Sequence, residues 1–366
     1  MFEDITTPTL LLHEDICRGN IRRMAEKAQQ LGIRLRPHMK TPQAIEVARW
    51  LRDYGIEAIT VSSFHMAEYF AADGWDDITV AFPVNIREME AIKKLSENIR
   101  LNVTVENVEG ARALQERLRQ GVRVWVKINI GNNRTGLLPE DTDRLDVLLD
   151  YLAQADRLHF CGFMGHAGQS YADRGEAAIA QTHRQSLAAM QALRKRYQGR
   201  FPQLEISVGD TPTASVMDRF PGVDELRPGN FLFYDLMQWQ IGACTTADIA
   251  VAMACPVVAK HPDRHEIVLY GGAVHFSKDY LTFSDGTPFY GLAAQWGEDG
   301  WELLQPEAYM RKLSQEHGIL RLPKALIDDI EIGSLMMILP VHSCLTANLM
   351  KGYRLMDGKS IEMMPF

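Results

Sequence analysis

The sequence predicts an α/β protein: a (β/α)8 barrel of the TIM type, followed by a second, β-rich domain. From residue 33 onward, short β-branched runs alternate with amphipathic stretches of helical period, which is typical of βα units in a parallel sheet. No G-x-G-x-x-G motif follows the first strand, and this disfavours an open dinucleotide-binding sheet. After Gln240 the helical period gives way to strand runs separated by Gly, Pro and Asp turns. We therefore expect a barrel at residues 14–243 and a β-rich domain formed by residues 1–13 and 244–366.

Eight runs are predicted as the strands of the barrel. They are Ile33–His38, Glu57–Ser63, Ile78–Phe82, Arg100–Val105, Arg123–Asn129, Leu158–His166, Glu205–Asp210 and Glu225–Asp235. The stretches of helical period are Asp15–Leu31, Gln43–Tyr54, His65–Ala72, Ile86–Asn98, Val108–Arg119, Asp141–Ala155 and Gly175–Arg196. The connection Thr211–Phe220 has room for one or two helical turns. Eight parallel strands over about 200 residues fit a closed barrel.

The β-rich domain is predicted from four strand runs. They are Val251–Ala259, His265–His275, Ile330–Leu339 and Tyr353–Met364, with a turn at residues 284–288. In this part of the chain, helical period remains mainly at Pro306–His317. The N-terminal run Thr9–His13 is surplus to the eight barrel strands, so we expect it to pair with the β-rich domain.

Charge and composition disfavour several classes of protein. The 366 residues carry 39 Lys and Arg against 47 Asp and Glu, a net charge of −8, without any basic block, so we expect no nucleic-acid or membrane partner. The acidic N-terminus lacks the apolar core of a signal peptide. The longest apolar run, Ile249–Ala259, has about half the ~20 residues that a membrane-spanning helix needs. Because neither a signal peptide nor a spanning helix is indicated, we expect a cytoplasmic location. Five scattered cysteines without C-x-x-C predict no disulfide framework.

The first barrel strand leads into Lys40, at the end where (β/α)8 barrels place their chemistry. A solvent-exposed loop lysine is the ordinary interpretation. The alternative is a nucleophile that forms a Schiff base with an aldehyde. Burial and neighbouring cations such as Arg36 favour this second role, because they keep an amine uncharged.

Later strand ends present further polar groups. The turn Gly131–Gly136 presents Arg134 after the fifth strand, and the sixth strand ends near His166 and Tyr171. A buried structural histidine is an equally good interpretation of His166. The seventh and eighth ends, at residues 207–213 and 226–231, are rich in small residues, which suits the phosphate site that barrels commonly place there.

One residue separates His342 from Cys344 in the segment Leu339–Asn348. On an extended strand, positions i and i+2 point the same way, so an imidazole and a thiolate would reach one metal ion. Nitrogen and sulfur donors suit Zn²⁺ better than Mg²⁺ or Ca²⁺. Two protein ligands leave positions for water and substrate, as catalysis requires. A buried cysteine beside an unrelated histidine is the simpler interpretation.

Together these segments resemble fold-type III pyridoxal-phosphate enzymes, the alanine-racemase-like barrel family, and within it the branch of the D-serine dehydratases and D-threonine aldolases. The resemblance spans nearly the whole chain. It rests on residues 7–12, Arg36–Thr41, Gly131–Gly136, Glu225–Asn230 and Pro340–Asn348. The lysine motif is fairly specific, and the final His-x-Cys motif is the most discriminating.

The resemblance implies roles for the site residues. Lys40 would hold pyridoxal 5'-phosphate as a Schiff base, Arg134 would lie near the phenolic oxygen of the cofactor, and His342 and Cys344 would bind Zn²⁺, with Mn²⁺ as the alternative. The cofactor contacts expected elsewhere are Tyr171, Gly209, Thr211, Gly229 and Asn230. A homodimer acting on a small D-amino acid is also implied.

Two departures from the family pattern affect these expectations. Relatives often follow the lysine with Thr-His-Lys, where residues 41–43 here are Thr-Pro-Gln. Dehydratase relatives often show Ser-Thr-Pro-Thr, where this chain has Asp210–Thr213. Because a carboxylate beside a phosphate is unfavourable, we expect the Asp210 side chain to point away or the phosphate contact to be shifted. Arg227 falls where racemases hold the pyridine nitrogen, and its role stays open.

The first functional hypothesis is a metal-assisted lyase that eliminates water from a D-3-hydroxy amino acid, giving a 2-keto acid and ammonia. Lys40 would take the Cα proton, and the metal would help the hydroxide to leave. The second is an aldolase that breaks Cα–Cβ with His166 as base, although aldolase relatives usually carry Asp in place of Cys344. The third is a racemase, and the fourth is a non-catalytic pyridoxal-phosphate carrier. Such carriers resemble the barrel alone, so the residues after Gln240 count against the fourth hypothesis.

Overall fold

The computed structural model describes residues 2–297, 300–304 and 308–365. The chain forms two compact units. The barrel unit comprises Arg23–Lys40 and Val47–Gly229, and the β unit comprises Met1–Arg22, Thr41–Glu46 and Asn230–Phe366.

The barrel unit contains one sheet of eight parallel strands in the order β2-β9-β8-β7-β6-β5-β4-β3. Their bounds are β2 (Arg34–Leu35), β3 (Ala58–Val61), β4 (Asp77–Pro83), β5 (Arg100–Val105), β6 (Val122–Ile128), β7 (Leu158–Gly165), β8 (Glu205–Val208) and β9 (Glu225–Leu226). The first and last strands in this order meet at a bridge between His38 and Thr60. The Thr60 N–H donates to Pro37 O at 2.8 Å there. The sheet is therefore closed, and the predicted barrel is confirmed.

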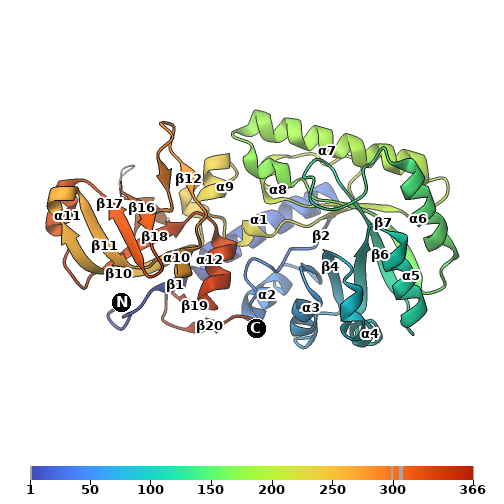
Figure 1. The fold of residues 1–366 in the computed structure, drawn as a ribbon, viewed down its shortest axis with the longest axis horizontal. Helices are drawn as coiled ribbons and strands as arrows, with labels where there is room; N and C mark the ends of the chain where they lie inside the picture. The colour runs from blue at the N-terminus through green and yellow to red at the C-terminus, as the bar shows by residue number, and fades with distance from the viewer. Residues whose placement is uncertain (1, 298–299, 305–307, 366) are drawn as a thin grey trace. The chain divides into compact units, whose positions relative to one another are not determined.

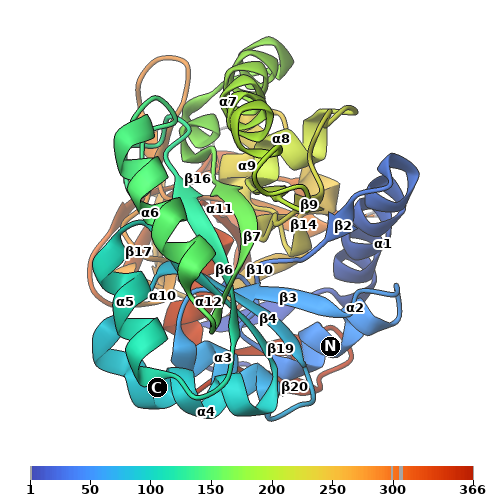
Figure 2. The ribbon, with the colours of Figure 1, turned by 90° about the vertical axis from the view of Figure 1, so that its right-hand side faces the viewer.

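Helices cover the outside of this sheet (Figures 1 and 2). They are α1 (Glu14–Leu31), α2 (Ile45–Arg52), α3 (Phe64–Ala71), α4 (Met89–Asn98), α5 (Val108–Arg117), α6 (Thr142–Gln154), α7 (Glu176–Tyr197) and α8 (Thr211–Val216). Leu145, Leu148, Leu149 and Leu152 of α6 are all buried. This i, i+3, i+4, i+7 spacing is the amphipathic pattern that identifies the helix in the sequence.

The eighth barrel strand is shorter than predicted. It ends at Leu226, because Pro228 and Gly229 interrupt the run that was expected to reach Asp235. A 3-10 turn at Asn230–Leu232 and helix α9 (Leu236–Ile241) follow.

The β unit contains a second closed sheet. Six antiparallel strands form a ring in the order β10-β11-β17-β16-β14-β18, and β18 pairs with β10 again. The ring strands are β10 (Val251–His261), β11 (Glu266–Tyr270), β14 (Gly291–Trp296), β16 (Tyr309–Leu313), β17 (His317–Arg321) and β18 (Leu335–Pro340). The smaller strands are β12 (Leu281–Thr282), β13 (Pro288–Phe289), β15 (Trp301–Leu303), β19 (Gly352–Leu355) and β20 (Ser360–Glu362).

The N-terminal strand β1 (Thr9–Leu12) belongs to this second sheet. It pairs antiparallel with β10 and parallel with β19. The pairing expected for the run Thr9–His13 is therefore confirmed.

Two predictions for the β unit are wrong at least in part, and two of its helices were missed. The expected helix at Pro306–His317 is instead the hairpin of β16 and β17 from Tyr309 onward, because pairing with β11 and β14 outweighs local helical period; residues 306 and 307 lie outside the described part. The strand expected to reach His275 stops at Tyr270, and Gly271 and Gly272 lead into helix α10 (Ala273–Phe276). Helices α11 (Lys324–Asp329) and α12 (Ser343–Met350) were not predicted.

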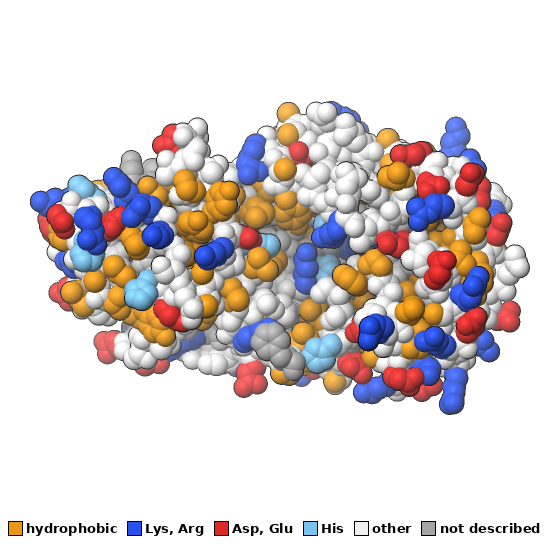
Figure 3. Space-filling view, viewed as in Figure 1, with side chains coloured by type: hydrophobic (Ala, Val, Ile, Leu, Met, Phe, Trp, Pro, Cys, Tyr) orange, Lys and Arg blue, Asp and Glu red, His pale blue; other side chains and the backbone are white. Residues whose placement is uncertain are grey.

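The surface agrees with the absence of a basic block in the sequence. Figure 3 shows Lys, Arg, Asp and Glu side chains interspersed on the visible face of the barrel unit. Within the described residues, every helix is too short or too polar to cross a membrane.

Candidate active site

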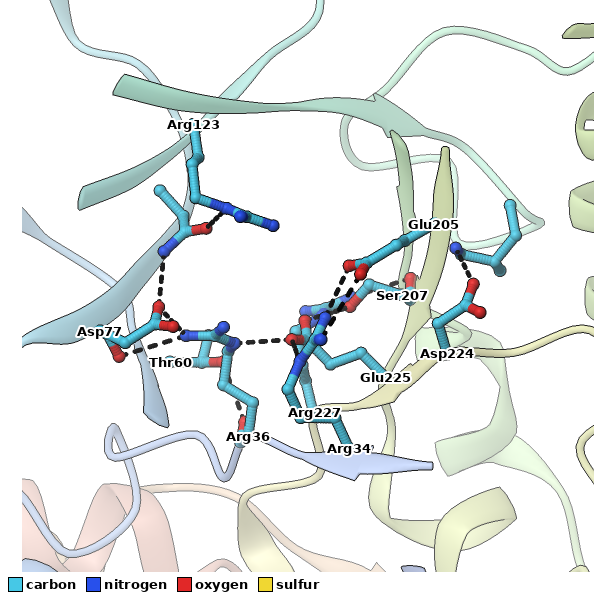
Figure 4. Close-up of polar contacts among 12 residues, drawn as sticks. Arg34, Arg36, Thr60, Asp77, Arg123, Glu205, Ser207, Asp224, Glu225 and Arg227 are labelled. Carbon is cyan, nitrogen blue, oxygen red and sulfur yellow. Dashed lines mark hydrogen bonds and ion pairs between the residues drawn. The ribbon is translucent and has the colours of Figure 1, made fainter. Parts of the chain in front are cut away.

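A buried ion network fills one layer of the barrel interior (Figure 4). The Glu225 carboxylate on β9 accepts hydrogen bonds from Arg34 Nε at 2.8 Å and Arg36 Nε at 2.7 Å. Arg36 Nη1 also donates to Asp77 Oδ1 on β4 at 2.6 Å. Burial opposes the charge on Glu225, but Arg36 and Arg34 lower its pKa to about 2. Arg36 thus links β9 to β4. This link spans the point where the sheet closes, and where only the bridge between His38 and Thr60 joins the first strand to the last.

This network corrects one expectation about Lys40. The sequence suggested Arg36 as a cation that would promote an uncharged Lys40 amine. Arg36 is instead paired with two carboxylates, so its charge is compensated inside the barrel.

A hydrogen-bonded chain connects this layer to Arg227. Ser207 Oγ donates to Glu225 Oε1 at 2.7 Å and accepts from Arg227 Nε at 2.6 Å. Arg227 Nη2 donates to Gly165 O at 2.6 Å. Burial lowers the pKa of Arg227 to about 10. The guanidinium is therefore fixed near the C-terminal ends of β7, β8 and β9.

Lys40 follows the His38–Thr60 bridge and is half-buried. Its backbone N–H donates to His38 Nδ1 at 3.3 Å. Burial, then Lys40 and Arg227, hold the pKa of His38 well below its usual range, so the ring is neutral. Because Nδ1 accepts a hydrogen bond, the single proton of this ring is on Nε2.

His166 has the opposite tautomer. Its Nδ1 contacts the carbonyl oxygen of Gly209, which only accepts hydrogen bonds, so Nδ1 carries the proton and Nε2 keeps a lone pair. Burial, then Lys127 and Lys40, hold the pKa of His166 well below its usual value, and Arg134 acts in the same direction. The barrel unit therefore brings Lys40, His166 and Arg134 together, with His166 able to accept a proton through Nε2.

Tyr171, Gly209 and Thr211 also lie together. The Thr211 N–H donates to Tyr171 Oη at 3.4 Å, and the rings of Tyr171 and His166 are 6.4 Å apart between centroids. Thr211 Oγ1 is buried without a hydrogen-bond partner among the described residues. A Cβ on Gly209 would lie 2.8 Å from Arg227 O, so only glycine fits there without a shift of the backbone.

Asp210 points away from these groups. Its carboxylate accepts hydrogen bonds from Thr213 N and Thr213 Oγ1, both at 2.8 Å, and from Ser170 Oγ at 3.0 Å. Burial raises the pKa of Asp210 to about 6. The carboxylate caps α8 and ties it to the 3-10 turn Gly168–Ala172.

The turn Gly131–Gly136 exposes Arg134 after β6. Gly136 has a φ of +104°, and a Cβ there would lie 2.6 Å from Asn129 N. The Gly136 N–H donates to Glu106 Oε2 at 2.6 Å. The turn therefore requires glycine at this position and is attached to the end of β5.

His342 and Cys344 are not on a strand, contrary to the sequence prediction. Strand β18 ends at Pro340, His342 caps helix α12, and Cys344 is its second residue. The two side chains nevertheless interact, because a hydrogen bond to Cys344 contributes to the raised pKa of His342. The strand-to-helix junction places the imidazole and the thiol together.

The surroundings of this pair suit a metal cation. His342 Nδ1 lies 2.8 Å from Asp279 Oδ2, which leaves Nε2 for a metal. Burial opposes protonation, yet Asp279 and Cys344 raise the pKa of His342 to about 10. Cys344 Sγ lies 3.2 Å from Thr41 Oγ1 and 3.5 Å from Asn230 Nδ2. The described residues show no group of three or more His, Cys, Asp or Glu able to hold a metal, so this pair would supply two ligands.

Several of these residues were missed in the sequence. His38 could have been found, since it lies two residues before Lys40 in the same motif. Lys127 is a charged residue in a predicted buried strand, which is itself a signal. Asp279 lies 63 positions from His342, and no local pattern connects the two. Gly229, in contrast, was among the residues predicted as cofactor contacts, and it is buried directly after β9.

Comparisons with known proteins agree with this geometry. The family model for the alanine racemase N-terminal domain matches residues 12–236, and the model for a serine dehydratase domain matches residues 250–356. The D-threo-3-hydroxyaspartate dehydratase of Delftia sp. is 30% identical over 96% of this chain and 94% of its own length. The D-serine dehydratase of Dictyostelium discoideum is 25% identical over 97% of this chain and 94% of its own.

The fold agrees as well. The solved structure of the Delftia dehydratase matches with a TM-score of 0.90 and 28% identity, over 99% of this chain and 98% of that one. Another solved form is a cysteine-to-alanine mutant described as metal-free, at 27% identity over 99% and 98% of the two chains with a TM-score of 0.91. The D-threonine aldolase of Arthrobacter sp. is 26% identical over 95% of this chain and 88% of its own. The chain belongs to the alanine racemase N-terminal domain family of pyridoxal-phosphate enzymes, together with the D-3-hydroxy amino acid dehydratases.

Proposed function

We propose that this protein is a pyridoxal-phosphate- and zinc-dependent lyase that eliminates water from a D-3-hydroxy amino acid, giving a 2-keto acid and ammonia. Membership in a family with dehydratases of D-serine and D-threo-3-hydroxyaspartate supports the reaction class. The observation that carries the proposal is the His342–Cys344 pair, because elimination of hydroxide needs a Lewis acid and this pair offers nitrogen and sulfur donors beside Asp279.

The barrel residues fit the cofactor. Thr211 Oγ1 is a buried hydroxyl without a partner among the described residues, and Gly209 leaves its backbone bare beside it. These groups suit a phosphate, with Gly229 and Asn230 as further contacts. Lys40 would hold the cofactor through Nζ. When bound, pyridoxal phosphate supplies an electron sink for the charge that develops at Cα.

The chain's own groups would then move the protons. In this proposal Lys40 Nζ takes the Cα proton. Arg134 would lie beside the phenolic oxygen of the cofactor, and Tyr171 Oη would orient Thr211 by accepting a hydrogen bond from its backbone N–H. A zinc ion at His342 and Cys344 would supply the Lewis acid for the β-hydroxyl. Thr41 supports the link between the two functions, since it follows Lys40 in the chain and its Oγ1 contacts Cys344 Sγ.

Cleavage of Cα–Cβ is the second candidate, and His166 is the observation that favours it. An aldolase needs a base for the β-hydroxyl proton, and His166 presents the lone pair of Nε2. A D-threonine aldolase is also among the relatives of this chain. Cys344 weighs against this candidate, since aldolases of the family usually carry Asp there.

One assay separates these candidates. The purified protein is incubated with D-serine, D-threonine and D-threo-3-hydroxyaspartate, and keto acid, glycine and the ratio of D to L forms are measured. Keto acid that disappears with a chelator and returns with Zn²⁺ is the expected result. Formation of glycine without keto acid would refute the dehydratase proposal and support the aldolase.

The proposal includes a cytoplasmic homodimer. The family resemblance is its support, and light scattering on the purified protein measures the mass directly. A mass of 41.4 kDa, that of one chain, would exclude the dimer.

A further inference from the structure

Asp235 is a buried carboxylate to which the proposed function gives no role. It precedes helix α9 in the β unit and is 0% exposed. Its Oδ1 accepts a hydrogen bond from Gln238 N at 3.0 Å, and this bond caps α9. A helix cap of this kind needs only one side-chain oxygen. The second oxygen, Oδ2, is therefore free to bind groups outside α9.

This second oxygen binds the residue between the two candidate metal ligands. Asp235 Oδ2 accepts hydrogen bonds from Ser343 N at 2.9 Å and from Ser343 Oγ at 3.2 Å. Ser343 is the first residue of α12 and lies between His342 and Cys344 in the chain. Because both its backbone and its side chain are bound, the start of α12 is held in one position. Asp235 therefore fixes the segment that carries the imidazole and the thiol.

Asp235 also orients the amide of Asn230. Asn230 Nδ2 donates to Asp235 Oδ2 at 2.6 Å, and the same nitrogen lies 3.5 Å from Cys344 Sγ. A carboxylate that accepts hydrogen bonds requires the NH2 group of the amide, and not its carbonyl, on this side. Asn230 Oδ1 is left buried without a partner among the described residues. Asp235 thus ensures that a donor faces the sulfur, which binds metals as a thiolate and would be repelled by an acceptor.

The hydrogen bonds of Asp235 come from neutral groups. Among the described residues, its donors are two backbone N–H groups, one amide and one hydroxyl. Neutral donors satisfy the carboxylate oxygens, but they do not balance a negative charge in a buried site. A divalent cation bound by His342 and Cys344 would add positive charge on the far side of Ser343. Charge and geometry therefore favour the same role for Asp235.

We propose that Asp235 is a positioning residue of the metal site, which holds Ser343 and the Asn230 amide so that His342 and Cys344 can bind one cation. This inference rests on the proposed function for the metal, and it adds a residue outside the ligand pair. Substitution of a group that orients metal ligands typically lowers metal affinity by roughly 10–100-fold.

Asp235→Asn isolates this role from the capping of α9. Asparagine caps a helix as well as aspartate does, so its Oδ1 can keep the bond from Gln238 N. Its Nδ2 takes the place of Oδ2 and brings a donor against the donors of Ser343 and Asn230. The variant therefore keeps the helix cap and loses the link to the metal segment. The control is Asp141→Asn, the same change at the N-cap of α6 in the barrel unit.

The test measures metal binding separately from turnover. Metal-free protein is titrated with Zn²⁺ in competition with a chromophoric chelator, and with Co²⁺, whose absorbance reports coordination by a thiolate. Asp235→Asn should bind Zn²⁺ roughly 10–100-fold more weakly than the wild type, and its thiolate-to-Co²⁺ band should lose intensity. Asp141→Asn should match the wild type in both titrations. Excess Zn²⁺ should restore keto acid formation in Asp235→Asn.

Ser343→Ala is the second variant. It removes the hydroxyl and keeps the backbone N–H, so Zn²⁺ affinity should fall by only about threefold. If Asp235→Asn folds and binds Zn²⁺ and Co²⁺ as the wild type does, the inference is overturned and Asp235 only caps α9. If Asp235→Asn does not fold, Ser343→Ala decides: a weaker Zn²⁺ affinity supports the inference, and an unchanged one overturns it.

The outcomes also separate this inference from the proposed reaction. If the wild type forms no keto acid from D-serine or D-threo-3-hydroxyaspartate, but Asp235→Asn weakens Zn²⁺ binding, the reaction is wrong and the role of Asp235 stands. If keto acid formation requires Zn²⁺, but Asp235→Asn binds Zn²⁺ normally, the reaction stands and the inference fails. A wild type that binds no Zn²⁺ would overturn both the metal site and the inference.

Discussion

The two closed sheets of this protein differ in what fills them. The strands of the parallel barrel bury several polar side chains, namely Thr60, Thr79, Asn102, Thr104, Lys127, Ser207 and Glu225. In the described residues of the six antiparallel ring strands, the only buried polar side chain is Glu266, which pairs with Arg311 at 2.6 Å. One closed sheet encloses a layer of ion pairs, and the buried side chains of the other are almost all apolar.

The comparison teaches where function and stability reside. Buried ion pairs contribute little net stability, because desolvation offsets their attraction. They do fix geometry, and here they connect β4, β9 and Arg227. Aliphatic side chains in the ring, such as Ile267 and Ile338, are fully buried and stabilise by removal of apolar surface from water. Substitutions in the two interiors should therefore have different effects.

The largest effect is expected for Lys40→Ala. It should remove the near-visible absorbance of the bound cofactor and lower kcat by about 1,000-fold or more, because the general base and the cofactor attachment are lost together. Absorbance after dialysis and steady-state kinetics measure this, with Lys195→Ala as control. A retained absorbance band would refute the assignment of Lys40.

A smaller but still large loss is expected for Cys344→Ala. Activity should fall by roughly 100-fold, since a catalytic metal with one protein ligand is weakly held. The cofactor absorbance should be unchanged. Metal content by atomic emission and keto acid formation check this, and Cys161→Ala provides a buried cysteine of the barrel unit as control. Full activity of Cys344→Ala would make Cys344 a packing residue.

Ile338→Ala tests whether the interior of the β unit contributes to stability rather than to catalysis. The free energy of unfolding should fall by about 2–5 kcal/mol, because a fully buried isoleucine leaves a cavity in the ring. Activity per folded molecule should remain close to wild type. Urea denaturation followed by circular dichroism measures the first, and kinetics measure the second. A stable variant with impaired turnover would contradict the separation of roles.

Glu225→Gln tests the ion layer through pH. The pKa of Glu225 is lowered to about 2 from an ordinary 4.5. A lowered pKa in the folded state adds stability that is present above pH 4.5 and is lost as the pH falls through about 2. This contribution is roughly 3 kcal/mol at most. Stability of the wild type should therefore fall more steeply than that of Glu225→Gln as the pH is lowered from about 5 to 3. The control Glu97→Gln, at an exposed site on α4, should show the same pH dependence of stability as the wild type. Parallel curves of stability against pH for all three proteins would show that Glu225 does not contribute to this pH dependence.

The periodicity of apolar residues and a few short sequence motifs predicted much of this architecture. The alternation of strand runs and amphipathic stretches predicts eight barrel strands, and all eight are present. Lys40 and the His-x-Cys segment were also recognised, because a short motif carries its own spacing. The helix predicted at Pro306–His317 failed because β16 and β17 form a hairpin whose two strands also pair with β14 and β11. Pairing with strands from an earlier part of the chain is invisible to a local window.

What the sequence by itself determined is the order of the elements and the chemical types available at the strand ends. Only the tertiary structure decided the protonation of these groups and their partners. The tautomers of His38 and His166 are set by a backbone N–H and a carbonyl, and His342 is oriented by Asp279 from a separate segment. The reason is physical: hydrogen bonds and electrostatic energies depend on distance and burial in space, and a linear sequence specifies neither until the sheets close.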